Sequence, residues 1–118
     1  MFEAEDLRHW RSLDVVDSQA SKIGTLEAVY FDTASQQPAF ATVRVGIVGR
    51  HRLVFVPLAG ATVTPKHVRV QADKKLVKDA PSIEVDGELA AADEPAIFEH
   101  YNLVYQPGTS GERRLGRR

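Results

Sequence analysis

The feature that most constrains this chain is the stretch of residues 23–32, which is rich in β-branched and aromatic side chains. Such a composition favours a β-strand over a helix. Residues 33–38 supply turn-forming types, and a second strand-like run covers residues 39–45. The two runs predict a β-hairpin, and the neighbouring segments are placed to pair with it.

The alternation of apolar residues within the first strand is imperfect. Val29 and Phe31 share one face of a regular strand, whereas Leu26 falls on the other face unless one extra residue is inserted near Glu27 and Ala28. We therefore predict a β-bulge at that point. A bulge sharpens the twist of a strand and helps a sheet to curl towards closure.

Shorter apolar runs bounded by turn residues flank the hairpin, at residues 15–16, 53–56 and 68–70. Many short strands with turn signals between them are typical of a small barrel or a strongly bent sheet. The fold class that the sequence predicts is mainly β, a small six-stranded antiparallel β-barrel with a short C-terminal helix.

The C-terminal helix is predicted over residues 92–101. Asp93 is a candidate N-cap, and Glu94 lies in the first turn, where a negative charge suits the helix dipole. Ile97, Phe98 and Tyr101 form one apolar stripe at helical spacing, which predicts docking onto the barrel. Asn102 suits the left-handed residue that often ends a helix, and residues 103–105 are expected to pack where the chain turns back.

At 118 residues the chain is long enough for one hydrophobic core. We expect an N-terminal cap segment over residues 1–12, the barrel over residues 13–84, and a helical extension over residues 85–106 that packs on the barrel. Residues 107–118 contain four arginines and one large apolar side chain, Leu115. This composition predicts a disordered arginine-rich tail.

Composition excludes several classes of function. There is no cysteine to form a disulfide or to act as a thiolate nucleophile. The longest apolar stretch, residues 53–63, is interrupted by Pro57 and Gly60 and is shorter than the roughly 20 residues that span a bilayer. The first six residues carry three acidic side chains and no basic one, unlike the start of a signal peptide. We expect a cytoplasmic protein with no membrane insertion and no cofactor.

No pattern of residues predicts a catalytic or metal site. The four histidines are scattered and are not spaced like zinc ligands, at positions His9, His51, His67 and His100. Asp14, Asp17 and Asp32 could converge at one end of the barrel, but strand ends and side-chain turns explain them better than a cation site. There is no nucleophile elbow and no phosphate loop, so we expect a protein that is not an enzyme.

Charge is segregated along the chain although the net charge is −1. Residues 44–78 hold eight basic side chains and one acidic one, whereas residues 79–106 hold seven acidic side chains and none that are basic. The two parts either face each other in the fold or present separate charged surfaces to partners. The first alternative is the more ordinary one.

The order of these signals resembles the PRC-barrel family. The resemblance rests on a short valine strand ending in an acid, on Ile23-Gly24 opening the next strand, on Val56-Pro57-Leu58 at a strand end, and on a closing segment at residues 75–81. The family is named for the photosynthetic reaction-centre H subunit and includes a domain of the ribosome maturation factor RimM. Residues 93–105 resemble a helical extension of some bacterial members. Where relatives usually carry glycine in the turn before Ile23, this chain has Ala20 and Ser21.

The resemblance implies a non-enzymatic adaptor that binds a protein or a ribonucleoprotein. We expect a protein partner of unknown identity, including a second copy of this chain in a homodimer. The candidate partner-binding residues are all aromatic: Tyr30, Phe40, Phe55, Phe98, Tyr101 and Tyr105. The alternative is an RNA- or ribosome-associated factor that binds a polyanion. Its candidate residues are all arginines: Arg44, Arg50, Arg52, Arg113, Arg114, Arg117 and Arg118.

Overall fold

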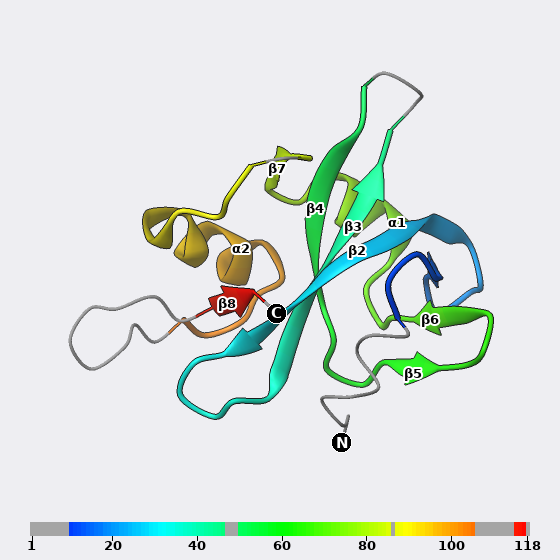
Figure 1. Ribbon diagram of the computed structural model, residues 1–118, viewed down its shortest axis with the longest axis horizontal. Helices are drawn as coiled ribbons and strands as arrows, with labels where there is room; N and C mark the ends of the chain where they lie inside the picture. The colour runs from blue at the N-terminus through cyan, green and yellow to red at the C-terminus, as the bar shows by residue number, and fades with distance from the viewer. Residues whose placement is uncertain (1–9, 47–49, 86, 106–114, 118) are drawn as a thin grey trace.

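The computed structural model describes residues 10–46, 50–85, 87–105 and 115–117. Its main element is one strongly twisted sheet (Figure 1). The strands are β1 (Asp14–Val16), β2 (Lys22–Asp32), β3 (Pro38–Val45), β4 (Arg52–Pro57), β5 (Thr62–Val63), β6 (His67–Arg69), β7 (Ser82–Glu84) and β8 (Leu115–Arg117). The helices are α1 (Lys74–Lys78), the 3-10 helix η2 (Ala91–Asp93) and α2 (Glu94–His100). The prediction of a mainly β fold with a short C-terminal helix is confirmed.

Strand β2 is the strand around which the sheet is organised. Its partner along one edge is β3, and the predicted hairpin is therefore present. Its other edge is divided between two short strands, because β1 pairs with the beginning of β2 and β8 pairs with its end. The full order of the sheet is β5-β6-β1-β2-β3-β4-β7, with β8 attached to β2.

The predicted β-bulge is confirmed. Leu26 pairs with Val43 and Ala28 pairs with Thr42, so Glu27 has no partner in the ladder. The extra residue explains the broken alternation, because it lets Leu26 and Val29 enter the same core although they lie three residues apart.

Both faces of the central strands are buried. Val29, Ala41 and Val54 belong to a first core, which lies against α1, β1 and β6. Their immediate neighbours point the opposite way into a second core, where Tyr30 and Phe55 meet Leu89, Ile97 and Leu115. Figure 1 shows this division, with α2 and β8 on one side of the crossing strands and α1, β5 and β6 on the other.

The sheet differs in detail from the predicted six-stranded antiparallel barrel. Over the described residues it is open, with β5 and β7 as its end strands, and it contains eight strands. One pair, β1 with β6, is parallel. The segment expected to close the barrel begins as helix α1, whose first turn is capped by the Asp73 carboxylate accepting the Lys75 N–H at 3.1 Å. Only Val77 of this helix is buried, so one helical turn is enough to cover the sheet at this point.

Helix α2 lies where the sequence predicts it, but one detail of its N-cap differs. Asp93 occupies the N-cap position without a side-chain hydrogen bond to the helix. Glu94 lies in the first turn, as predicted, and its side chain is fully buried. The prediction for the other end is confirmed, because Asn102 adopts a left-handed conformation with φ of 58°.

The two ends of the chain extend the cores. Trp10 is buried in the first core, while residues 1–9 of the predicted cap segment lie outside the described residues. The prediction of a disordered tail is wrong for residues 115–117, which form β8 with Leu115 fully buried. This segment is ordered because it pairs with β2 and because Leu115 packs in the second core. Composition alone did not indicate either contact. Residues 106–114 and 118 lie outside the described part.

Candidate protein-binding surface

Three of the aromatic residues predicted to contact a partner are interior residues. Tyr30, Phe40 and Phe55 all lie in the second core, and the Tyr30 and Phe55 rings meet edge to face at 5.1 Å between centroids. The prediction assumed that only one face of these strands is covered. That assumption is wrong, because α2, Leu89 and β8 cover the second face and leave the three side chains at most 3% exposed. Phe40 and Phe55 still contribute to the floors of surface hollows.

The other three aromatic residues join α2 and the segment after it to the sheet. Phe98 packs edge to face against Phe40 at 5.1 Å and against Tyr105 at 5.0 Å. The Tyr101 hydroxyl donates a hydrogen bond to the backbone carbonyl of Phe55. Partial burial raises the pKa of Tyr101. These side chains hold the helix in place, and each keeps a partly exposed surface.

An apolar groove lies beside this aromatic cluster, between the ends of β3 and β4 and the chain that follows α2. Its volume is about 670 Å³. The residues that line it include Pro38, Pro57, Ala59, Phe98, Leu103 and Val104. We call this feature the apolar groove.

Leu103 and Val104 form the rim of the apolar groove on the helix side. Leu103 is 42% exposed and Val104 is 81% exposed. Residues 103–105 were expected to pack where the chain turns back, but only Tyr105 does so, through a hydrogen bond from its hydroxyl to Glu94 at 2.8 Å. The exposure of Leu103 and Val104 could have been predicted from their position directly after Asn102. The left-handed conformation of Asn102 turns the chain away from the helix surface.

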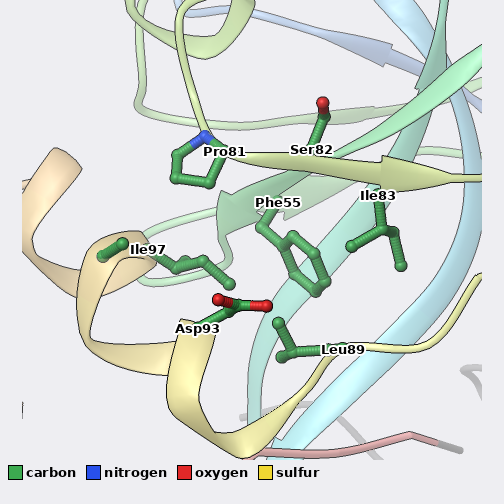
Figure 2. A pocket seen from close by; sticks show the side chains of 8 residues that line it. Phe55, Pro81, Ser82, Ile83, Leu89, Asp93 and Ile97 are labelled. Atoms are coloured by element: carbon green, nitrogen blue, oxygen red, sulfur yellow. The ribbon is translucent and has the colours of Figure 1, made fainter.

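A smaller pocket of about 260 Å³ lies on the other side of α2, between the helix and strands β4 and β7. Figure 2 shows the side chains of Phe55, Ile83, Leu89 and Ile97 gathered there, with the Asp93 carboxylate at the side of the helix. Half of the eight lining residues, these four, belong to the second core or pack against it. The polar side chains that line it are Ser82 and Asp93.

The basic residues that the sequence indicated gather only in part. Arg44 lines an open hollow of about 480 Å³ together with Lys22, His51 and Lys74. Arg44 also pairs with Glu27 at 3.4 Å, and its buried Nε has no hydrogen-bond partner among the described residues.

The other candidate arginines lie elsewhere. Arg50 is exposed, and Arg52 donates to the backbone carbonyl of Lys78 at 3.1 Å. Arg117 contributes its backbone to β8. The side chain of Arg117 and the whole of Arg113, Arg114 and Arg118 fall outside the described residues.

The three aspartates considered for a cation site have structural roles and lie apart. Asp17 is buried and accepts hydrogen bonds from the backbone N–H groups of Ser21 and Gln19, each at 2.9 Å. These bonds, that of Ser21 first, hold the pKa of Asp17 below its ordinary value. Asp32 organises the β2–β3 turn by accepting from Ala34 at 2.7 Å. In the described part of the chain no three histidine or acidic side chains are grouped to hold a metal.

The fold and these surfaces define a small β domain built on one strongly bent sheet, with hydrophobic cores on both faces and an exposed apolar groove. Among the helices that the structure describes, none has the length and apolar character needed to cross a bilayer.

Comparison with known proteins assigns this β domain to a family. The family model of the PRC-barrel domain matches residues 2–77. The chain belongs to the PRC-barrel family, whose domain is a small β unit often involved in interactions. A search of curated proteins finds no match.

Proposed function

We propose that this protein is a non-catalytic binding module that associates with a protein partner through the apolar groove. The observation that carries the proposal is the exposure of Leu103 and Val104 at the rim. Fully burying an aliphatic side chain of this size stabilises a complex by about 1.5–3 kcal/mol. Two adjacent side chains of this kind beside a preformed apolar surface favour recognition of another protein.

Charge around the groove indicates the chemistry of the partner. The groove is lined by uncharged residues, and α2 beside it belongs to a segment, residues 79–106, with seven acidic and no basic side chains. A partner segment with apolar side chains for the groove and flanking lysine or arginine residues is complementary to this surface.

The experiment compares Val104→Asp with a matched control, Val63→Asp. Val63 is also an exposed valine, at 37%, but it lies on β5 and does not line the groove. Crosslinking capture from lysate of the native host is followed by quantification of each captured protein. We expect a basic, apolar partner to be captured by the unchanged chain and by Val63→Asp, and at least tenfold less by Val104→Asp. Equal capture by all three chains would contradict the proposal.

A second candidate function, binding of RNA or another polyanion, is favoured by one observation. Lys22, Arg44, His51 and Lys74 line the same open hollow, and the buried Nε of Arg44 has no partner among the described residues. Against it, Lys22 already pairs with Asp14 at 3.3 Å and Arg44 pairs with Glu27.

Polyanion binding predicts affinity for single-stranded RNA that falls steeply with salt concentration. Lys74→Gln should reduce the affinity and the salt slope, whereas Arg69→Gln, an exposed arginine on β6 that does not line the hollow, should change neither. Filter-binding titrations between low and physiological salt measure both quantities. Equal effects of the two substitutions would remove the hollow as the binding site.

A further inference from the structure

Strand β8 pairs with a part of β2 that the other strands of the described residues do not reach on this edge. On the edge of β2 opposite β3, strand β1 reaches only as far as Thr25, and β8 pairs with Tyr30, Phe31 and Asp32. An unpaired strand edge presents free backbone N–H and C=O groups, which is the arrangement that proteins use to bind an added strand. In this chain the added strand comes from its own C-terminal end.

The site that holds β8 recognises more than the backbone. Leu115 is fully buried in the second core with Tyr30, Leu89 and Ile97. Its N–H donates a hydrogen bond at 3.0 Å to the carboxylate of Glu94, which is itself fully buried. A leucine pocket and a buried acceptor placed at its entrance are the features of a specific peptide-binding site.

The next residue adds a second specificity element. A Cβ atom added to Gly116 would lie 2.8 Å from Cζ of Phe31, closer than such atoms approach in proteins. The site therefore favours glycine after leucine, because a larger residue would have to displace the end of the partly exposed Phe31 ring. Backbone pairing, a leucine pocket and a preference for glycine together define a strand site for a Leu-Gly sequence.

A second copy of the chain carries the same strand and can make the same contacts. Residues 106–114 join β8 to the rest of the chain and contain Pro107, Gly108 and Gly111 but no large apolar side chain. Exchange of identical segments between two copies preserves every contact of the segment, so the joining residues and the protein concentration decide between the closed and the exchanged form.

We propose that the edge of β2 at Tyr30–Asp32 is a strand-binding site that accepts Leu115–Arg117 of a second copy, producing a tail-exchanged dimer. The chain's own tail competes for the site at an effective concentration on the order of millimolar. The closed monomer therefore dominates in dilute solution, and exchange increases as the protein concentration approaches that range. The apolar groove takes no part in this dimer.

The first test supplies the strand in trans. Full-length protein with Leu115→Asp has an intact site but a tail that cannot fill it, and it is titrated calorimetrically with a peptide of residues 112–118. A control peptide carries serine in place of the leucine and keeps the same charge. We expect one peptide to bind each Leu115→Asp chain. The same peptide should bind the unchanged chain at least tenfold more weakly, and the control peptide should bind neither chain. Absence of binding to the folded Leu115→Asp chain would overturn the proposal.

If Leu115→Asp does not fold, as judged by circular dichroism, a chain ending at Arg114 takes its place in the same titration, with the same criteria. Light scattering then tests the dimer directly, from micromolar to millimolar protein. The unchanged chain and Val104→Asp are expected to dimerise with rising concentration, while Leu115→Asp stays monomeric. A dimer that persists in Leu115→Asp would show that the tail is not exchanged. A dimer that Val104→Asp abolishes would place the interface at the groove and would equally contradict the proposal.

Discussion

The buried carboxylate of Glu94 accepts a hydrogen bond from the backbone N–H of Leu115 at 3.0 Å, across 21 positions of the chain. The same carboxylate accepts the Tyr105 hydroxyl at 2.8 Å. One side chain thus connects the start of α2, the segment after the helix and the last strand of the sheet. The relationship explains why a charged residue is buried in an otherwise apolar core.

Glu94→Gln should destabilise the fold. Two donors point at the two carboxylate oxygens, and an amide offers one oxygen and one further donor, so one donor would lose its acceptor inside the protein. The expected loss is about 1–3 kcal/mol in the free energy of unfolding. Urea denaturation measures it, with Glu99→Gln on the exposed face of the same helix as the control. Equal midpoints for the two variants would contradict the role assigned to Glu94.

Gly24→Ala should damage the sheet at its centre. A Cβ atom at this position would lie 2.1 Å from the carbonyl oxygen of Arg44 in the neighbouring strand, and a backbone atom of a paired strand cannot move aside. We expect a loss of about 3 kcal/mol, at the upper end of the usual range for overpacking. Gly87→Ala is the control, because a Cβ atom at position 87 would come no closer than 3.2 Å to another atom, the carbonyl oxygen of Glu84. Thermal unfolding of both variants gives the comparison, and a stable Gly24→Ala chain would be inconsistent with this register.

Ala20→Gly should stabilise the protein. Ala20 has φ of 66°, a left-handed conformation that costs residues with a Cβ atom about 1–2 kcal/mol. Glycine removes this strain but loses more entropy on folding, so the expected net gain is about 0.5–1 kcal/mol. Ala34→Gly, in a turn without positive φ, should show only the entropic loss. If both substitutions changed the melting temperature in the same direction, the strain at Ala20 would be disproved.

Asp17 should make the stability of the protein depend on pH in acid. Its pKa is lowered in the folded state, mainly by the N–H of Ser21, so the unfolded chain binds a proton more readily. Its contribution is present above the ordinary value of 3.8 and is lost as the pH falls through the lower folded-state pKa. Asp17→Asn should therefore lower the melting temperature at pH 7, and the difference from the unchanged chain should shrink as the pH approaches 2. A difference that does not vary with pH would mean that the charge of Asp17 is unimportant.

Several elements followed from local sequence patterns. The hairpin, the bulge at Glu27, the C-terminal helix and the left-handed Asn102 were predictable because each depends on residues close together in the chain. The turn roles of Asp17 and Asp32 were predictable for the same reason, since short acidic side chains bond to nearby backbone N–H groups.

The candidate site was predicted less well, because exposure depends on what the distant parts of the chain cover. The sequence around Phe40 and Phe55 does not show whether their face of the strand is covered. The docking of α2 and β8 is what buries them. Leu103 and Val104 have the pattern of a packed segment, yet the turn after Asn102 leaves them exposed. No alternation or spacing within the chain distinguishes these outcomes.

The sequence by itself determined the class of fold, the central hairpin with its bulge and the position of the helix, because strand and helix signals arise from side chains a few residues apart. The tertiary structure alone decided that the sheet is open over the described residues, that both of its faces are covered, and that Leu115 and Glu94 meet. The physical reason is that strand pairing and burial join segments far apart in the chain. A three-residue strand such as β8 becomes ordered only because β2 offers it an edge and the second core offers its leucine a pocket.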